Sequence, residues 1–477
     1  MKKLIALVFL ITIIACKKEV KQTEANSVLE EQTELKPISA KDLETAIIYE
    51  ANIRQYSKEG TFKQFTKDIP QLKQLGVKVI WLMPVFPISQ TKRKATGGDF
   101  ASKIEDPKER AKALGSYYAV SDFKKINPEF GTIEDFRSLL KTAHKNGMYV
   151  ILDWVPNHTG WDHTWLKTNP EFYTKNAIGE ITDPLNDDGT SVGWADVADL
   201  NYDSEGLRKA MIEDMLYWIT EEGIDGFRCD VAGSVPTDFW QETIPQLRAK
   251  KDIFMLAEAW EPELMKGDLF DMAYGWDRHH TMNHIAKGEK DATAWTATTQ
   301  KDAERYEADD ILMNFITNHD ENSWNGTVKE RMGDAAEAML ALSYVAPGMP
   351  LIYSGQEYDM SHRLKFFEKD EIIRKKGKTW PILEKLGKLK NTSSALHVGK
   401  NAAKYKQLLN NNKNVLTFER HKNGVYVTYI ANLSNKEQTL NVPTVGEFID
   451  YMKNEKLEYK DGEIVTLKPW EYKILID

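Results

Sequence analysis

The sequence has few cysteines and no basic cluster, and each absence restricts what the protein can be. It contains 2 cysteines in 477 residues; Cys16 lies in the N-terminal segment, which leaves Cys229 without a partner for an intramolecular disulfide. The formal net charge is −9, and the body of the chain carries no Lys/Arg block, which argues against a nucleic-acid partner. A small or neutral polymeric ligand fits this composition better.

The N-terminus has the layout of a secretory signal. Two lysines precede an apolar run over residues 4–14, which is too short to span a bilayer as a permanent helix. The run ends in "IIAC" and resembles a bacterial lipoprotein signal. We therefore expect a signal peptide at 1–15, a lipidated Cys16 and a flexible linker over 16–40. The expected location is the bacterial cell envelope, at the outer membrane, with the lipid anchor as the only membrane contact; plain secretion is the alternative.

Eight short apolar runs alternate with helical patterns and predict the fold of the catalytic part. Near-continuous apolar strands separated by helices indicate a parallel sheet, and eight such units predict a closed (β/α)₈ barrel over 41–156 and 204–397. An open, doubly wound sheet is the alternative. The predicted strands are 46–53, 77–83, 148–153, 224–230, 253–258, 270–275, 311–318 and 350–355.

Helix signals occur between these runs. Thr61 with Gln64, and Thr132 with Asp135, have the spacing of capping boxes. Apolar positions recur at helical spacing after Thr132, and again over 204–222.

Two segments depart from the barrel pattern. About fifty residues follow the third strand before the next helix, and this predicts an inserted loop domain over 157–203. Beyond residue 398 the chain changes to alternating runs separated by "NG", "SNK" and "DG" turns, which predict an antiparallel β-sandwich over 398–477.

Charged residues gather at the predicted carboxyl ends of the strands, where a barrel of this kind has its active site. A single acid there could be a helix cap, but four acids with an arginine and two histidines are hard to explain as caps. Like charges held close raise the pKa of at least one carboxyl, while Arg228 would keep Asp230 ionised. One proton donor and one anionic nucleophile are what retaining glycosidic cleavage needs. The set comprises Asp153, His158, Arg228, Asp230, Glu258, His319 and Asp320.

The ordered motifs "DWVPNH", "GFRCD", "AEAW" and "TNHD" resemble the four sequence regions of the α-amylase family, glycoside hydrolase family 13. The resemblance covers most of the chain. It implies that Asp230 is the nucleophile, that Glu258 is the general acid/base and that Asp320 stabilises the transition state. It further implies that His158 and His319 bond sugar hydroxyls and that Tyr118 stacks on the ring. Arg228 would hold Asp230, with Asp153 in support.

The same resemblance implies a structural calcium ion held by Asn157 and Asp199, and no organic cofactor. The chain departs from the family after Asp230, where Gly233 and Ser234 replace a Lys-His pair that touches sugars on the leaving-group side and helps to hold calcium. This departure puts both the calcium and the leaving-side specificity in question.

The expected activity is hydrolysis of α-1,4-glucosidic bonds in starch-like glucans or maltodextrins. A transglycosylase acting on malto-oligosaccharides and a non-catalytic glycan-binding protein are the alternatives. The sequence leaves open endo or exo action, linkage preference, the membrane face and the oligomeric state.

Overall fold

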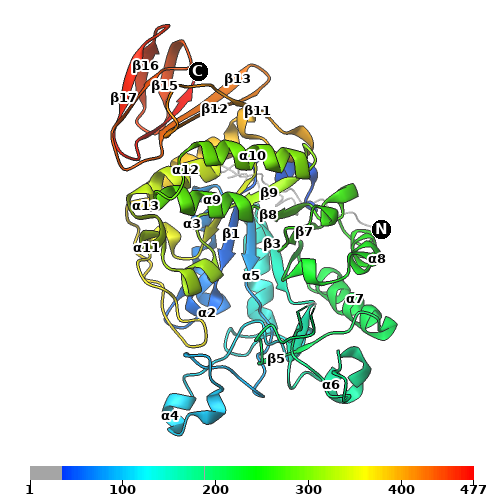
Figure 1. Ribbon diagram of the computed structural model, residues 1–477. Coiled ribbons are helices and arrows are strands. Elements are labelled where there is room, and N and C mark those ends of the chain that lie inside the picture. Colours follow the sequence, from blue (N-terminus) through cyan, green and yellow to red (C-terminus); the bar gives the residue numbers. More distant parts are fainter. Residues whose placement is uncertain (1–34, 187) are drawn as a thin grey trace, which may run out of the picture. The chain divides into compact units, whose positions relative to one another are not determined.

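Eight parallel strands pair side by side and close into a barrel in the computed structural model, which describes residues 35–186 and 188–477 (Figure 1). The first and last strands pair with each other, with Ile48 opposite Leu351, so the sheet is not the open alternative. The order around the barrel is β1-β10-β9-β8-β7-β6-β3-β2. The strands are β1 (Ile48–Ala51), β2 (Val79–Leu82), β3 (Tyr149–Trp154), β6 (Gly226–Cys229), β7 (Phe254–Ala257), β8 (Met272–Tyr274), β9 (Ile311–Asn314) and β10 (Met349–Tyr353).

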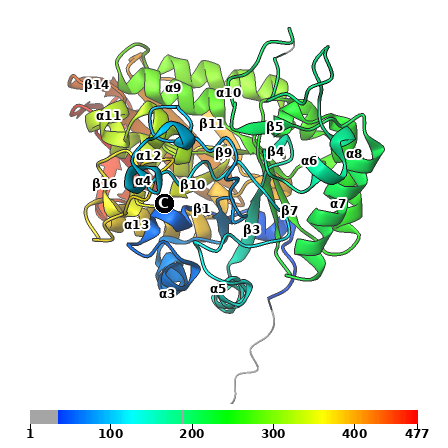
Figure 2. The ribbon, with the colours of Figure 1, turned by 90° about the horizontal axis from the view of Figure 1, so that it is seen from below.

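Helices surround these strands, as the view in Figure 2 shows. Every barrel strand is buried on both faces, because side chains inside the barrel and helices outside it cover the two sides. The longer helices are α3 (Phe62–Leu72), α5 (Ile133–Lys145), α7 (Glu205–Thr220), α8 (Thr237–Arg248), α9 (Trp276–Ala286), α10 (Thr293–Arg305), α12 (Ala336–Val345) and α13 (Thr379–Thr392). Single turns form α1 (Ala40–Leu43), α2 (Ile53–Tyr56), α4 (Pro107–Arg110), α6 (Trp165–Thr168) and α11 (Val328–Met332).

The two predicted capping boxes have different outcomes. Thr132 and Asp135 cap α5 reciprocally, as predicted. The prediction at Thr61 is wrong, because its side chain makes no cap hydrogen bond and the Gln64 amide oxygen accepts from Lys67 instead. The backbone N–H of Phe62 bonds to Phe130 O, so α3 begins on a tertiary contact.

The segment after β3 carries little regular structure. Its two short strands, β4 (His158–Gly160) and β5 (Val197–Asp199), pair antiparallel and set His158 opposite Asp199. This pairing brings both ends of the inserted segment back to the barrel rim.

The C-terminal strands form two antiparallel sheets, in agreement with the prediction. Within the described residues the larger sheet has the order β11-β12-β13-β18-β15-β16, and β14 pairs with β17 beside it. Leu440 and Leu467 of the small sheet share a buried cluster with Ile430 and Leu475 of the large one, so the two sheets pack as a sandwich. Asn423 and Gly424 both have positive φ, as a two-residue hairpin turn requires. The strands are β11 (Lys404–Gln407), β12 (Val415–Lys422), β13 (Val425–Asn432), β14 (Gln438–Asn441), β15 (Gly446–Asp450), β16 (Glu455–Tyr459), β17 (Ile464–Leu467) and β18 (Tyr472–Ile476).

The predicted signal peptide, Cys16 and most of the predicted linker lie outside the described residues. Among the described helices, none is both long and apolar enough to cross a membrane. Cys229 is buried and free.

Candidate active site

The predicted site residues meet at the carboxyl ends of neighbouring strands. Asp153 of β3 lies opposite Arg228 of β6, and Cys229 lies opposite Ala257 of β7. Asp230 and Glu258 therefore follow adjacent strands, and the parallel register carries both side chains to the same rim.

Arg228 is the centre of the charge cluster, and its side chain is fully buried. One terminal nitrogen, Nη1, donates to Asp230 Oδ1 at 2.7 Å and to Asp153 Oδ1 at 2.8 Å. The other, Nη2, lies 2.8 Å from Glu258 Oε2, in a contact of charges rather than a hydrogen bond. One guanidinium thus holds three carboxyl groups within reach of one another.

The backbone bends sharply directly after Asp230. Val231 has φ 36° and ψ 46°, a left-handed conformation that costs a β-branched residue about 1–3 kcal/mol. In this conformation its N–H donates to Glu258 Oε2 at 2.9 Å. The strained residue therefore connects the loops that carry Asp230 and Glu258.

Burial raises the pKa of each carboxyl group in the cluster, and that of Asp153 to about 7. The two nearby cations, on Arg228 and His319, oppose this rise. Five carboxyl groups face two cations, so the cluster as a whole takes up and releases a proton near neutral pH. The five belong to Glu50, Asp153, Asp230, Glu258 and Asp320.

His319 is a buried cation within this cluster. Burial lowers its pKa, but the carboxylates of Asp320 and Glu50 outweigh that effect and raise it to about 9. Its Nε2 lies 2.7 Å from Tyr118 Oη and 3.3 Å from Asp320 Oδ2, while Nδ1 bonds to Glu50. Glu50 therefore fixes the orientation of the ring.

Tyr118 and His158, two of the residues predicted to contact the sugar, lie beside this cluster. The Tyr118 hydroxyl donates to Asp153 Oδ2 at 3.1 Å, and its ring stacks on His319. Burial lowers the pKa of His158 to about 4, so it is a neutral imidazole that can donate and accept hydrogen bonds. Its ring packs edge-on against Trp194 of the inserted segment.

A cavity of about 300 Å³ opens above these groups. It is mostly aromatic at one end and polar around the carboxyl groups, which suits a sugar ring with apolar faces and a polar edge. Its lining residues are Lys94, Ser116, Tyr118, His158, Trp194, Asp196, Val197, Asp230, Val231, Glu258, His319, Asp320, Trp324, Phe366 and Phe367.

The aromatic end is formed by Phe366 and Phe367 of the long loop after β10 and by Trp324 of the segment after β9. Gln55 holds this loop by donating from Nε2 to Lys365 O at 2.7 Å and to Glu368 O at 2.8 Å. Phe366 consequently lies parallel to Tyr118, with Trp324 packed beside it.

Asn157 and Asp199, the predicted calcium ligands, line a neighbouring cavity. Burial raises the pKa of Asp199, which a bound cation would reverse. Calcium takes six to eight oxygen ligands, and this pair supplies one amide and one carboxylate. No group of three or more His, Cys, Asp or Glu in the described ranges could hold a metal, so any further ligands would be carbonyls or water.

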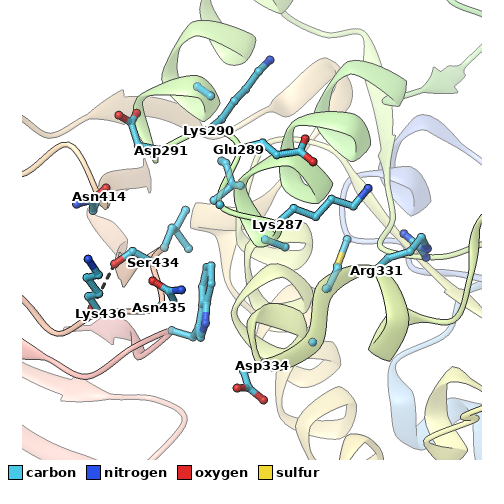
Figure 3. Close-up of a pocket in the computed structure, with 18 of the residues that line it drawn as sticks. Lys287, Glu289, Lys290, Asp291, Arg331, Asp334, Asn414, Ser434, Asn435 and Lys436 are labelled. Carbon is cyan, nitrogen blue, oxygen red and sulfur yellow. Dashed lines mark hydrogen bonds between the residues drawn. The ribbon is translucent and has the colours of Figure 1, made fainter.

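Another cavity, of about 960 Å³, lies between the barrel helices and the C-terminal sheets (Figure 3). Lys287, Glu289 and Asp291 come from the turn between α9 and α10, and Asn435 and Lys436 come from the turn after β13. None of the predicted site residues lines it.

Several residues of the site were missed from the sequence. Glu50 had a signal, since it is the only charged residue in its apolar run. Trp81 and Tyr274, which bond Asp153 and Arg228, looked like ordinary strand aromatics. Trp194 and Phe366 lie in irregular segments and Trp324 lies in a single π-helical turn, Glu321–Asn325, and no periodicity of the sequence marks their direction.

A family model described as "Alpha amylase, catalytic domain" matches residues 26–177 and 191–415. The alpha-amylase MalA of Haloarcula japonica is 26% identical over 67% of this chain, which spans 45% of that protein's length. A 4-alpha-glucanotransferase of Thermotoga neapolitana is 28% identical over 63% of this chain and 68% of its own. The crystal structure of an alpha-amylase from Lactobacillus plantarum superposes with a TM-score of 0.79 and 28% identity, covering 91% of this chain and 99% of that one.

Proposed function

The chain belongs to the alpha-amylase family, and from this premise we propose that it is a retaining glycosidase that cleaves α-1,4-glucosidic bonds in starch-like glucans or maltodextrins. The observation that carries the proposal is the Arg228 guanidinium in contact with both Asp230 and Glu258. Two carboxyl groups drawn this close suit attack by one of them, for which a separation of about 5–5.5 Å is typical, rather than activation of a water between them.

The first chemical step forms a glycosyl ester. An oxygen of Asp230 attacks the anomeric carbon, and the bond from that carbon to the leaving oxygen breaks as Glu258 transfers its proton to the oxygen. Burial favours the protonated form of Glu258 before the step. Two hydrogen bonds hold the reacting groups in place: Arg228 donates to Asp230, and the backbone N–H of Val231 donates to Glu258. Asp320, beside the cationic His319, stabilises positive charge that develops on the sugar ring.

The second step releases the sugar. The Glu258 carboxylate takes a proton from water, the water oxygen attacks the same carbon, and the ester bond to Asp230 breaks. Two inversions at one carbon give net retention of the α configuration.

The proposal is tested by incubating the protein with amylose, pullulan and maltotriose and following the products by chromatography and proton NMR. We expect new reducing ends, with the α-anomer formed first. If the folded protein releases no sugar from any α-glucan, or if the β-anomer forms first, the proposal is wrong.

Transfer to a second sugar is the other candidate, and the glucanotransferase relative favours it. In that case a sugar hydroxyl takes the place of water in the second step. Products longer than maltotriose in the same incubation would support transfer. A non-catalytic glycan-binding role is disfavoured, because the three carboxyl groups of the family motifs are all present at the rim.

We also propose the structural calcium ion expected from the family. Asn157 and Asp199 would hold it and would tie the inserted segment to the barrel. Removing metal with EDTA should lower the unfolding temperature of the wild type more than that of Asp199→Asn, and equal shifts would contradict the site.

For the N-terminus we propose a lipid on Cys16 and a place in the cell envelope. The layout of residues 1–16 supports this. Radiolabelled fatty acid should attach to the wild type and not to Cys16→Ala; equal labelling, or none of either, would overturn the proposal.

A further inference from the structure

The neighbouring cavity that Asn157 and Asp199 line has a volume of about 1030 Å³ and continues from the candidate active site as a second cavity. Trp194 lines both cavities. Asp230 and Val231 line the first, and the same loop then supplies Gly233 and Ser234 to the second. The loop after β7 does the same, with Glu258 in the first cavity and Glu261 in the second. Two loops therefore run from the reacting groups into this space.

The position of Glu258 gives this second cavity its role. The acid donates its proton to the oxygen that joins the reacting sugar to the leaving sugar. The leaving sugar must then lie beyond Glu258, where the loop continues to Glu261. The opposite end of the first cavity, formed by Trp324 and Phe366, is then left for the part of the glucan that stays attached to the reacting sugar.

Gly233 and Glu261 fit together at the border of this cavity. A Cβ at position 233 would overlap Oε2 of Glu261 and would lie 2.8 Å from its Cδ. Gly233 is not in the left-handed region, so this position needs glycine for space rather than for backbone conformation. The missing side chain at 233 is what admits the carboxylate of Glu261.

The loop that carries Glu261 is held rigidly. Its backbone N–H at Trp260 donates to Glu261 Oε2 at 2.9 Å. The Trp260 carbonyl accepts hydrogen bonds from Arg305 and Tyr306, and its indole stacks on Trp276. The carboxylate is thus exposed on a fixed support, which keeps low the cost of ordering it on binding.

We propose that Glu261 is a specificity-determining residue, whose carboxylate accepts hydrogen bonds from hydroxyl groups of the glucosyl unit on the leaving side of the cleaved bond, in space that Gly233 provides. This inference rests on the proposed glycosidase activity. The other carboxyl groups that line the cavity in the described ranges belong to Asp188, Asp199 and Asp203, and no lysine or arginine lines it there. Such a lining suits neutral sugar hydroxyls and repels phosphorylated sugars.

The experiment compares two substrates that differ on the leaving side. Maltotetraose places glucosyl units on the leaving side. The leaving group of α-maltosyl fluoride is a fluoride ion, so this substrate places no sugar on that side. Glu261→Gln should lower kcat/KM for maltotetraose by about tenfold or more, as expected for a lost charged hydrogen bond, and should leave kcat/KM for the fluoride within about twofold of wild type. Gly233→Ala should have the same selective effect, because its methyl group displaces the carboxylate.

Two further variants complete the design. Glu263→Gln, an exposed residue on the same loop that pairs with Lys266, should match the wild type on both substrates. In the double variant Gly233→Ala/Glu261→Gln, the effect should be smaller than the product of the single effects, because both changes act on one carboxylate. Unfolding temperatures would show that each variant is folded.

Equal loss on both substrates, or no loss with either variant, would overturn the role of Glu261 while leaving the glycosidase activity established by the wild type. If the wild type cleaves neither substrate, it is the proposed function that fails.

Discussion

The active-site cavity and the cavity of Figure 3 are both lined by charged side chains, but the pKa values of their carboxyl groups shift in opposite directions. In the active-site cavity, burial raises the pKa of Asp230, Glu258 and Asp320. In the cavity beside the C-terminal sheets, a hydrogen bond from Thr293 lowers the pKa of Asp291, and a hydrogen bond from His284 lowers the pKa of Glu289.

The partners explain the difference. At the rim, several carboxyl groups share the one guanidinium of Arg228, so each is only partly compensated. In the other cavity the acids have separate partners, as with Asp291 and Lys413 or Glu330 and Arg363. Carboxyl groups that compete for one buried cation can hold or release a proton near neutral pH, whereas solvated pairs remain ionised.

The largest contrast should come from matched aspartates. Asp230→Asn removes the nucleophile, so kcat on maltotriose should fall by about 10⁴-fold or more. Asp334→Asn, in the other cavity, should retain activity within about twofold. Product formation over time measures both, and near-wild-type turnover by folded Asp230→Asn would refute the assignment of the nucleophile.

The proton donor gives the next contrast. Glu258→Gln should lower kcat on maltotetraose by about 10²–10⁴-fold. The loss on α-maltosyl fluoride should be much smaller, because fluoride leaves without protonation. Glu289→Gln should change neither value. If kcat of Glu258→Gln fell equally on both substrates, the result would contradict a role as general acid.

Arg228→Lys tests the shared guanidinium. An ammonium group cannot contact three carboxyl groups in the same geometry, so their pKa values should rise further. Activity needs Asp230 ionised and Glu258 protonated. Higher pKa values move both limbs of the kcat/KM profile to higher pH, by about one unit, with a lower maximum. Arg331→Lys should leave the profile in place, and an unshifted profile for Arg228→Lys would contradict the shared role.

The barrel and the charged set at its rim could be predicted from the sequence, because both follow from local sequence patterns. All eight barrel strands are apolar runs bounded by turns, and the charged set at their ends follows from parallel register. The clustering of acids predicted a raised pKa for at least one carboxyl group, but not that of Asp230, because only the folded site shows that burial outweighs the effect of Arg228. The lowered pKa of Asp291 depends likewise on a hydrogen bond from Thr293 that the sequence does not reveal. Nor could the pairing of Gly233 with Glu261 be found, since it joins two loops through space.

The smallest effect should be on stability at Asp291. Its carboxylate accepts from the backbone N–H of Thr293 at 3.1 Å, at the start of α10, so Asp291→Ala should cost about 1 kcal/mol in the free energy of unfolding while activity stays at the wild-type level. The carboxyl has a lowered pKa, so its contribution is present above the unfolded value of 3.8 and is lost as pH falls through the folded value. Urea unfolding should therefore separate Asp291→Ala from the wild type at pH 7, and the difference should shrink progressively as the pH falls below 3.8.

Asp291→Asn separates the hydrogen bond from the charge. Asparagine also accepts a hydrogen bond at a helix start, so this variant should keep most of the stability at pH 7 that Asp291→Ala loses. If Asp291→Asn were as unstable as Asp291→Ala, the pair with Lys413 would be the dominant contribution rather than the hydrogen bond to Thr293. The same amide substitution then has opposite consequences in the two cavities: at Asp230 it removes a reacting oxygen and abolishes turnover, while at Asp291 it preserves the acceptor and the fold.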